Sequence, residues 1–215
     1  MSHAAVRLAR APVNYPGQVS EEEVVAQATG PAVARRRDRR PARTIRKVLD
    51  AGLEELRESS YATLTMRAIA RRAGVSAASA YTYFPSKSAL VAAIYLELLR
   101  EAPVTAGSED TTKYRVSAAM RDMALVVADE PELAAACGAA LMADDPAVAP
   151  LLTEIGIEVS NRISAALGPG WSEAVKTTLQ MTFAGALMAA RFSTYDEIAD
   201  QLDDAVNLIL GAAVA

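Results

Sequence analysis

The stretch Thr65–Leu90, which reads TMRAIARRAGVSAASAYTYFPSKSAL, decides how the rest of the chain is interpreted. Thr65 is a typical N-cap residue, and the apolar residues after it recur at helical spacing, which predicts a short helix. Gly74 accepts a positive φ at little cost and therefore ends that helix. Ser76 caps a second short helix that runs to about Phe84. Two short helices joined by a tight turn that contains glycine form a helix-turn-helix.

Amphipathic helices are predicted on both sides of this unit. Pro41 suits a first helical turn, and an apolar stripe at helical spacing follows it, formed by Ile45, Val48, Leu49, Leu53 and Leu56. Pro85 and Ser86 interrupt the chain and cap a helix over about 87–100. Farther on, helical patterns cover about 112–129, 131–142, 146–167, 172–193 and 196–213.

The chain as a whole is predicted to be helical, since no segment alternates with period two for long enough to be a strand. The fold class is all-α: an N-terminal three-helix helix-turn-helix domain followed by a larger helical bundle, about nine helices in all. We expect a disordered, Arg-containing N-terminal arm over 1–40, the helix-turn-helix domain with its connecting helix over 41–100, and the second domain over 101–215.

The composition excludes several classes of protein. The 215 residues are 52% hydrophobic and 22% charged, an ordinary soluble profile. His3 is the one histidine, which excludes a structural zinc site and catalysis by a Ser-His or Cys-His pair. Cys137 is the one cysteine, so no internal disulfide forms, which fits a reducing cytoplasm. With no membrane-spanning apolar run and no signal-peptide pattern, we expect a cytoplasmic protein with no membrane partner.

The net charge of −4 conceals blocks of opposite sign. Residues 35–100 hold 14 basic and 6 acidic side chains, a net charge of +8, whereas residues 101–215 hold 6 basic and 17 acidic side chains, a net charge of −11. A basic block suits a polyanion such as DNA, because its side chains release the counterions condensed on phosphates. The alternative is a solvated basic segment without a partner, above all for the run Arg35–Arg40.

A family resemblance rests on the combination of four short motifs in this region. They are Ile69-Ala70, Ala73-Gly74-Val75-Ser76, Tyr81-x-Tyr83-Phe84 and Lys87-x-x-Leu90. Together they resemble the DNA-binding domain of the tetracycline-repressor (TetR) family of bacterial transcriptional regulators. The resemblance covers about 50 residues, from the first to the fourth predicted helix, whereas the rest of the chain resembles the family in length and helical layout.

The resemblance implies that the second helix of the unit faces the DNA major groove and that residues around it contact phosphates. The DNA-binding residues implied in this way are Thr65, Arg67, Ala77, Ala78, Ser79, Tyr81, Thr82, Tyr83 and Lys87. The alternatives are a core position for Tyr83 and a surface position without DNA contact for Lys87. The groove-facing set lacks Arg, Asn and Gln, so we expect specificity from thymine-methyl contacts, tyrosines, water and DNA shape.

The resemblance also implies a homodimer and a small-molecule pocket in the second domain. Dimer contacts are expected on the last two helices, around Gly185 and along the apolar stripe from Ile198 to Leu210, with packing inside one subunit as the alternative. Methionines and other apolar residues suit an apolar ligand, although such residues also build cores. The candidate ligand-binding residues are Met120, Met123, Met142, Ile155, Val159, Asn161, Arg162, Thr178, Gln180 and Phe183.

The sequence therefore predicts a sequence-specific DNA-binding transcriptional regulator rather than an enzyme. We expect a repressor that a small apolar ligand releases from a palindromic double-stranded DNA operator, with no cofactor and no metal. One alternative is a non-specific architectural DNA-binding protein, which would bind all sequences equally. A helical-bundle enzyme is the other, and the lack of a placed histidine, a metal cluster and a phosphate-binding loop argues against it.

Overall fold

The computed structural model describes residues 31–128, 130–190 and 192–212, with side chains from Arg40 onward. This part of the chain forms nine helices and contains no strand, which confirms the predicted all-α class. The helices are α1 (Pro31–Glu58), α2 (Met66–Ala73), α3 (Ala77–Tyr83), α4 (Lys87–Glu101), α5 (Thr112–Leu125), α6 (Pro131–Leu141), α7 (Ala149–Leu167), α8 (Glu173–Ala189) and α9 (Tyr195–Ala212).

The first helix begins earlier than predicted. It starts at Pro31, and Pro41, which was expected in the first turn, lies inside it. The segment 31–40 is therefore helical, where the sequence predicted disorder. Pro31 takes the N-terminal position that favours proline, and alanine and arginine, which are good helix formers, occupy most of the positions before Pro41. Residues 1–30 lie outside the described part of the chain, so their predicted disorder stays a prediction.

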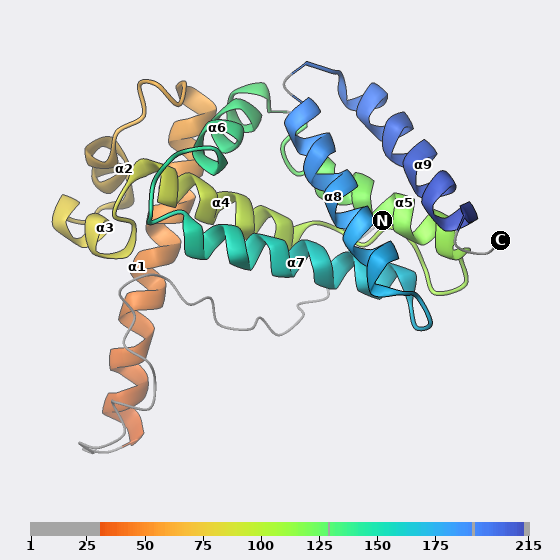
Figure 1. Cartoon of the computed structure of the whole chain (residues 1–215). Coiled ribbons are helices and arrows are strands. Elements are labelled where there is room, and N and C mark those ends of the chain that lie inside the picture. The colour runs from red at the N-terminus through yellow and green to blue at the C-terminus, as the bar shows by residue number, and fades with distance from the viewer. Residues whose placement is uncertain (1–30, 129, 191, 213–215) are drawn as a thin grey trace, which may run out of the picture.

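Three helices make the N-terminal unit, in which α2 packs against α1 and α3 against α2 (Figure 1). Their shared core includes Val48 and Leu56, which belong to the predicted apolar stripe of the first helix. Ile69 and Ala80 complete it, and all four residues are almost inaccessible to solvent. Ala80 is small and fully buried, so its helix lies close to the other two. The unit thus holds α3 by one side and leaves its other side open.

The fourth helix connects the two parts of the molecule, because it packs against α1 on one side and against α6 and α7 on the other. Every residue from Ser88 to Leu96 is buried, which is unusual for a helix that begins and ends at the surface. The contact with α1 is close: a Cβ at Gly52 would lie 2.9 Å from Ile94 Cδ1. If α4 shifts, its packing against α1 and against α6 and α7 therefore has to change as well.

The remaining helices form a second bundle that extends from α4. In it α5 packs against α7 and α9, and α8 packs against α7 and α9, so that α8 and α9 form the outer layer (Figure 1). The apolar stripe of α9, Ile198, Leu202, Val206 and Leu210, is buried against these neighbours. None of the helices in the described residues is both long and apolar enough to span a bilayer.

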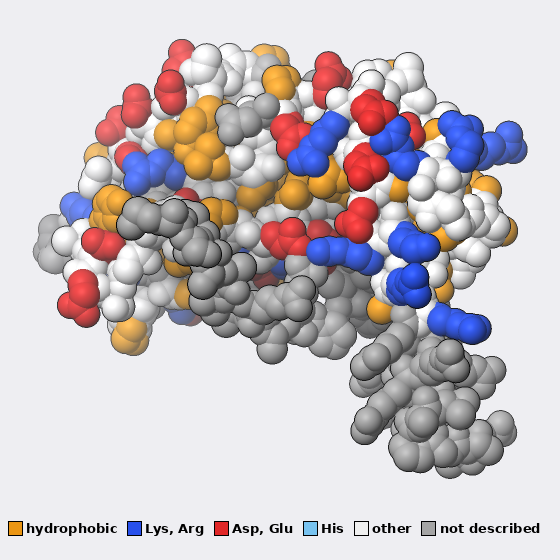
Figure 2. Space-filling view, turned by 180° about the vertical axis from the view of Figure 1, so that it is seen from behind, with side chains coloured by type: hydrophobic (Ala, Val, Ile, Leu, Met, Phe, Trp, Pro, Cys, Tyr) orange, Lys and Arg blue, Asp and Glu red, His pale blue; other side chains and the backbone are white. Residues whose placement is uncertain are grey.

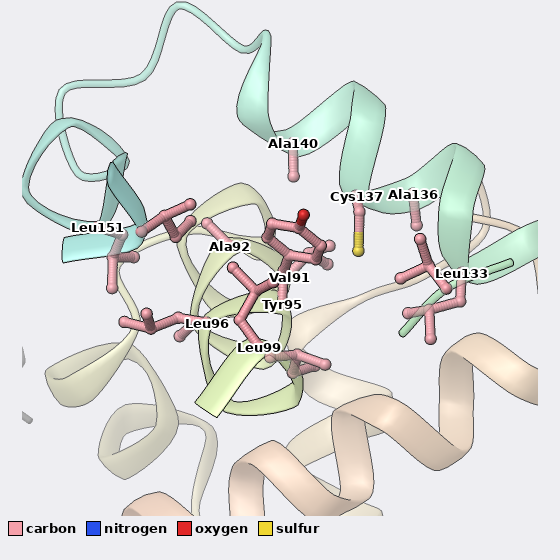
Figure 3. Close-up of a cluster of buried hydrophobic side chains, with 14 of the residues drawn as sticks. Val91, Ala92, Tyr95, Leu96, Leu99, Leu133, Ala136, Cys137, Ala140 and Leu151 are labelled. Carbon is pink, nitrogen blue, oxygen red and sulfur yellow. The ribbon is translucent and has the colours of Figure 1, made fainter. Parts of the chain in front are cut away.

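The packing of α4 against α6 encloses two polar groups in an apolar environment, shown in Figure 3. Tyr95 is buried among leucines and alanines, and no described residue lies within hydrogen-bonding distance of its hydroxyl. Cys137 on α6 is also buried, and burial raises the pKa of its thiol to about 12. Burial likewise raises the pKa of the Tyr95 hydroxyl. Both groups are therefore held in their neutral forms.

Removal of the buried Tyr95 hydroxyl is expected to stabilise the fold. A buried hydroxyl without a partner costs free energy that a phenyl ring avoids, so Tyr95→Phe should raise the free energy of unfolding by about 1 kcal/mol. Tyr61→Phe is the matched control, since the Tyr61 hydroxyl lies 2.8 Å from Ser88 Oγ and its loss should lower stability by a similar amount. Urea denaturation measures both, and a destabilised Tyr95→Phe variant would show that the Tyr95 hydroxyl has a stabilising partner.

Candidate functional site

The turn between α2 and α3 is fixed by hydrogen bonds from its own residues. The Thr65 side chain accepts from the backbone N–H of Ala68 at 3.2 Å and caps α2, as predicted. At the other end Gly74 has a φ of +65°, and its N–H donates to the Arg71 carbonyl at 3.2 Å. The Val75 N–H donates to the Ala70 carbonyl at 3.0 Å, which completes a Schellman-type C-cap.

The third helix begins and ends where the sequence places it. The Ser76 hydroxyl accepts from the Ser79 N–H at 3.1 Å, and the Phe84 N–H donates to the Ala80 carbonyl at 2.9 Å. Ala80 and Phe84 point into the core and are buried. The stretch Ala77–Tyr83 therefore has one buried side and one outer side, and the predicted groove-facing residues lie on or beside the outer side.

The outer side of α3 consists of Ala78, Tyr81 and Thr82, which are exposed, with Ala77, Ser79 and Tyr83 half-buried beside them. Tyr81 has 47% of its surface exposed. The Thr82 hydroxyl donates to the Ala78 carbonyl at 2.9 Å, and its oxygen can still accept a hydrogen bond. This surface offers methyl groups, an aromatic ring and hydroxyls, without any long cationic or amide side chain.

Three arginines of α2 differ in what they contact. Arg72 donates to Glu55 Oε1 and to Glu58 Oε1, each at 2.8 Å, and so ties α2 to α1. Its hydrogen bond lowers the pKa of the Glu58 carboxyl. Arg67 and Arg71, by contrast, are exposed and form no hydrogen bond or ion pair with a described residue. Arg71 is not among the residues predicted from the sequence, although it follows Arg67 at the spacing that places both on one helix face.

The Lys87 side chain is engaged within the molecule. Its ammonium donates to the Tyr61 carbonyl at 2.9 Å and lies 4.4 Å from the centroid of the Tyr61 ring. An ammonium has three donors, so a phosphate can still be contacted. The α1–α2 loop therefore holds this cation at the start of α4, beside the helix-turn-helix.

Charge is distributed over the surface as the sequence blocks predicted. On the face shown in Figure 2, most of the visible Lys and Arg side chains lie on the half that carries the N-terminal helices, and Asp and Glu are more frequent toward the other half. The acidic first turn of α9, with Asp196 and Glu197, belongs to the second half. A polyanion is thus attracted to one end of the molecule and repelled from the other.

A cavity of about 450 Å³ lies in the second bundle, between the α4–α5 loop, α5 and α7. This volume falls within the range of small-molecule sites in proteins. Its lining is mainly apolar, with three charged side chains, Arg115, Asp122 and Arg162. The complete lining is Pro103, Val104, Ala106, Gly107, Ser108, Arg115, Ala119, Asp122, Arg162, Ala165 and Ala166.

The predicted ligand-binding residues are dispersed rather than gathered in this cavity. Arg162 lines it, whereas five others are buried in the core: Met120, Met123, Ile155, Val159 and Phe183. Met142 is 65% exposed at the end of α6, and Asn161 and Thr178 are exposed on α7 and α8. Gln180 donates to Ser160 Oγ at 2.9 Å. The helical spacing of Arg115, Ala119 and Asp122 on one face of α5 was the signal that sequence analysis missed.

The sequence of the chain is similar to a known protein family and to known regulators. Residues 48–94, from α1 through most of α4, match the family of bacterial regulatory proteins called the tetR family. An HTH-type transcriptional regulator of Mycobacterium tuberculosis (strain ATCC 25618 / H37Rv) is 48% identical over 181 residues, which are 82% of this chain and 85% of that protein. A regulator of the same description in Mycobacterium bovis is similar to the same extent.

Solved structures share the fold at low sequence identity. A TetR transcriptional regulator from Rhodococcus sp. RHA1 has a TM-score of 0.67 at 20% identity, over 77% of this chain and 96% of that one. Thermus thermophilus FadR, a TetR-family repressor solved with lauroyl-CoA, has a TM-score of 0.60 at 20% identity, over 77% and 93%. Bacillus subtilis FadR, solved with stearoyl-CoA, has a TM-score of 0.51 at 17% identity, over 74% and 96%.

A capped helix-turn-helix on a basic unit, joined to a separate acidic bundle, defines a DNA-binding regulator. The similarity to the mycobacterial regulators is not confined to the N-terminal unit, because it covers most of the chain. The chain belongs to the TetR family of bacterial regulatory proteins. It is a transcriptional regulator, and its family is one of regulators rather than enzymes.

Substitution of Gly74 is expected to destabilise the helix-turn-helix through the backbone alone. A Cβ at this position meets no atom within 4 Å, so any cost comes from the φ of +65°. Gly74→Ala should lower the free energy of unfolding by about 1 kcal/mol, and Gly74→Asn by less, because asparagine tolerates the left-handed region better. Denaturant unfolding measures both variants, and equal stability of Gly74→Ala and the wild type would refute the turn conformation.

Proposed function

We propose that this regulator is a homodimeric repressor that a small apolar effector releases from a palindromic operator. The observation that carries the proposal is the exposed outer side of α3. Beside it lie the cations Arg67 and Arg71, which form no hydrogen bond or ion pair with a described residue. The repressor role of Thermus thermophilus FadR, which has the same fold, supports this direction of regulation.

In the proposed complex, α3 enters the major groove and reads bases through Ala78, Thr82 and their neighbours. Methyl groups there suit the thymine methyl, and hydroxyls suit the exposed edges of several bases. Thr65 and Arg67 at the start of α2, with Tyr81 and Lys87, contact the phosphates on either side. Arg71 joins this set, because it is exposed on the same face of α2 as Arg67.

The proposed dimer forms through the outer layer of the second bundle. On α8, Met181, Ala184, Gly185 and Met188 follow one another at helical spacing, and all are exposed. Met181 is 72% exposed, and Leu208 on α9 is 74% exposed. An exposed apolar stripe of this kind is a typical interaction site, and the small residues at its centre permit close helix contact. The α9 stripe considered earlier is buried within one subunit, so it belongs to the internal core.

The proposed effector binds in the second bundle and favours a conformation that has less affinity for DNA. The acyl-CoA molecules bound by the two FadR proteins support an acyl-like, largely apolar effector. Such a ligand shifts the equilibrium only by the difference between its affinities for the two conformations. The buried helix α4 lies between the two domains and is the element through which the shift would pass.

The direct test is selection of genomic DNA fragments by the purified full-length protein at physiological salt, where non-specific binding is weak. We expect recovery of a short palindrome with two equal half-sites. Equal recovery of all fragments would contradict the proposal and favour an architectural DNA-binding protein.

Two arginines of α2 provide a matched test of the phosphate contacts. Arg67→Gln should weaken binding to all DNA sequences and reduce the salt dependence of binding by about 1 unit, because one phosphate contact is lost. Arg72→Gln is the control, since Arg72 is occupied by Glu55 and Glu58 and its loss should leave the salt dependence unchanged. Filter binding over a range of salt concentrations measures both, and a larger effect of Arg72→Gln would reverse the assignment.

A charge in the α8 stripe should separate the subunits. Met181→Asp is expected to convert the dimer to a monomer and to abolish tight binding of a two-half-site operator, because a buried carboxylate without a partner is costly. Met142→Asp introduces the same charge at another exposed methionine, 65% exposed and outside the stripe, and should leave the dimer intact. Sedimentation velocity measures the state of both variants, and a dimeric Met181→Asp variant would overturn this interface.

A further inference from the structure

The charged residues of the 450 Å³ cavity are held in an unusual way, because two arginines in its lining each donate to backbone carbonyls near the end of a helix. Arg115 on α5 donates through Nε to the Ala166 carbonyl at 2.9 Å and through Nη1 to the Asp110 carbonyl at 2.6 Å. Ala166 belongs to the last turn of α7. Arg115 therefore caps the C-terminal end of α7, where a cation is favourable.

Arg162 plays the corresponding role at the end of α4. Its Nη1 donates to the Ala102 carbonyl and its Nη2 to the Arg100 carbonyl, each at 3.1 Å. Its Nε donates to Glu158 Oε1 at 2.9 Å. A guanidinium has five N–H donors, so hydrogens of Arg162 remain for an acceptor in the cavity.

Asp122, the carboxylate in the lining, forms no ion pair with either arginine. Both oxygens of Asp122 accept from Thr105, from its backbone N–H at 2.9 Å and from its hydroxyl at 2.9 and 3.1 Å. Asp122 thus fastens the α4–α5 loop to α5. Arg115 forms no ion pair with a described residue, and Glu158 pairs with Arg162 alone. The polar groups left to a ligand are mainly donors, which favours an acceptor with negative charge.

Apart from Ser108, the rest of the lining is apolar and small, with prolyl, valyl and alanyl side chains such as Val104, Ala119 and Ala165. A ligand that fits therefore combines one planar anionic group with an apolar body. A carboxylate matches the fork of a guanidinium in shape and carries a single negative charge.

The end of α4 is linked to the DNA-binding unit by ion pairs. Arg46 on α1 contacts Glu97 and Glu101 on α4, each at 3.0 Å, and Arg100 contacts Glu97 at 3.3 Å. Arg100 also contacts Glu154 on α7 at 3.0 Å. A change at the carbonyl of Arg100, to which Arg162 donates, therefore acts on the turn that holds α1.

We propose that this cavity binds a small carboxylic acid with an apolar body, and that Arg162 exchanges the C-terminal carbonyls of α4 for the ligand's carboxylate. The proposal rests on the effector-responsive function above and specifies its ligand class and the residue that transmits it. Binding loosens the last turn of α4, and the ion pairs of Arg46 carry the change to α1.

The first experiment measures binding of octanoate to the full-length protein by calorimetry, with octanamide as the uncharged control of the same shape. We expect octanoate to bind about 10- to 100-fold more tightly than octanamide, because a hydrogen-bonded charge is lost in the amide. Arg115→Gln and Arg162→Gln should each weaken octanoate binding by about tenfold or more and leave octanamide binding unchanged. Lys113→Gln, an exposed change on the same helix, should leave both unchanged.

Two further measurements make the test independent of stability losses in the arginine variants. Ala119→Leu fills the cavity without a change of charge and should abolish octanoate binding while the thermal midpoint stays close to the wild type. Amide hydrogen exchange in the last turn of α4 should become faster when octanoate binds, and should already be faster in ligand-free Arg162→Gln. Equal binding of octanoate by the wild type, Ala119→Leu and Arg162→Gln would overturn the proposal.

The outcomes separate this inference from the function on which it rests. A palindromic operator together with no octanoate binding would leave the repressor intact and refute the carboxylate site. Octanoate binding that is lost in Ala119→Leu, without any selected operator, would support the site and refute the repressor. Octanoate binding without faster exchange in α4 would refute the exchange at Arg162.

Discussion

Burial of α4 on all sides is the constraint on which the rest of the structure depends. The residues from Ser88 to Leu96 pack against α1 and against α6 and α7, so one short helix belongs to the cores of both halves. Its start is fixed by the Ser86 cap, whose hydroxyl also bonds to Asp145, and its end by Arg162. Because neither half is packed without it, the position of α4 sets the relation between the DNA-reading helix and the second bundle.

Features that depend on neighbours in the sequence were predictable. Thr65, Gly74 and Ser76 act within a few residues of themselves, and each has in the structure the capping or turn role that its type indicates. The third helix also ends near Phe84, as the sequence predicted. The fold class and the second-bundle helices followed from the same local patterns, to within a few residues at their ends.

Features that depend on tertiary contacts were not predictable from one sequence. Nothing in the local pattern of α2 tells that Arg72 is neutralised by Glu55 and Glu58 while Arg71 is not. The candidate ligand residues stay a prediction, and they are dispersed for the same reason: a methionine at helical spacing fits a core as well as a pocket, and Met120 lies in the core. The cavity is instead defined by the α4–α5 loop, whose course the helical periodicity leaves open.

The base reading proposed for the outer side of α3 bears on how modified pyrimidines are recognised. If methyl groups such as those of Ala78 and Thr82 read the major groove, the feature they detect is the methyl on C5 of a pyrimidine. Thymine carries that group, and so does cytosine after methylation at C5. A helix with arginine or asparagine would read the hydrogen-bonding edge instead and respond less to such a change. For a helix that reads bases in this way, thymine and 5-methylcytosine present the same methyl group in the major groove.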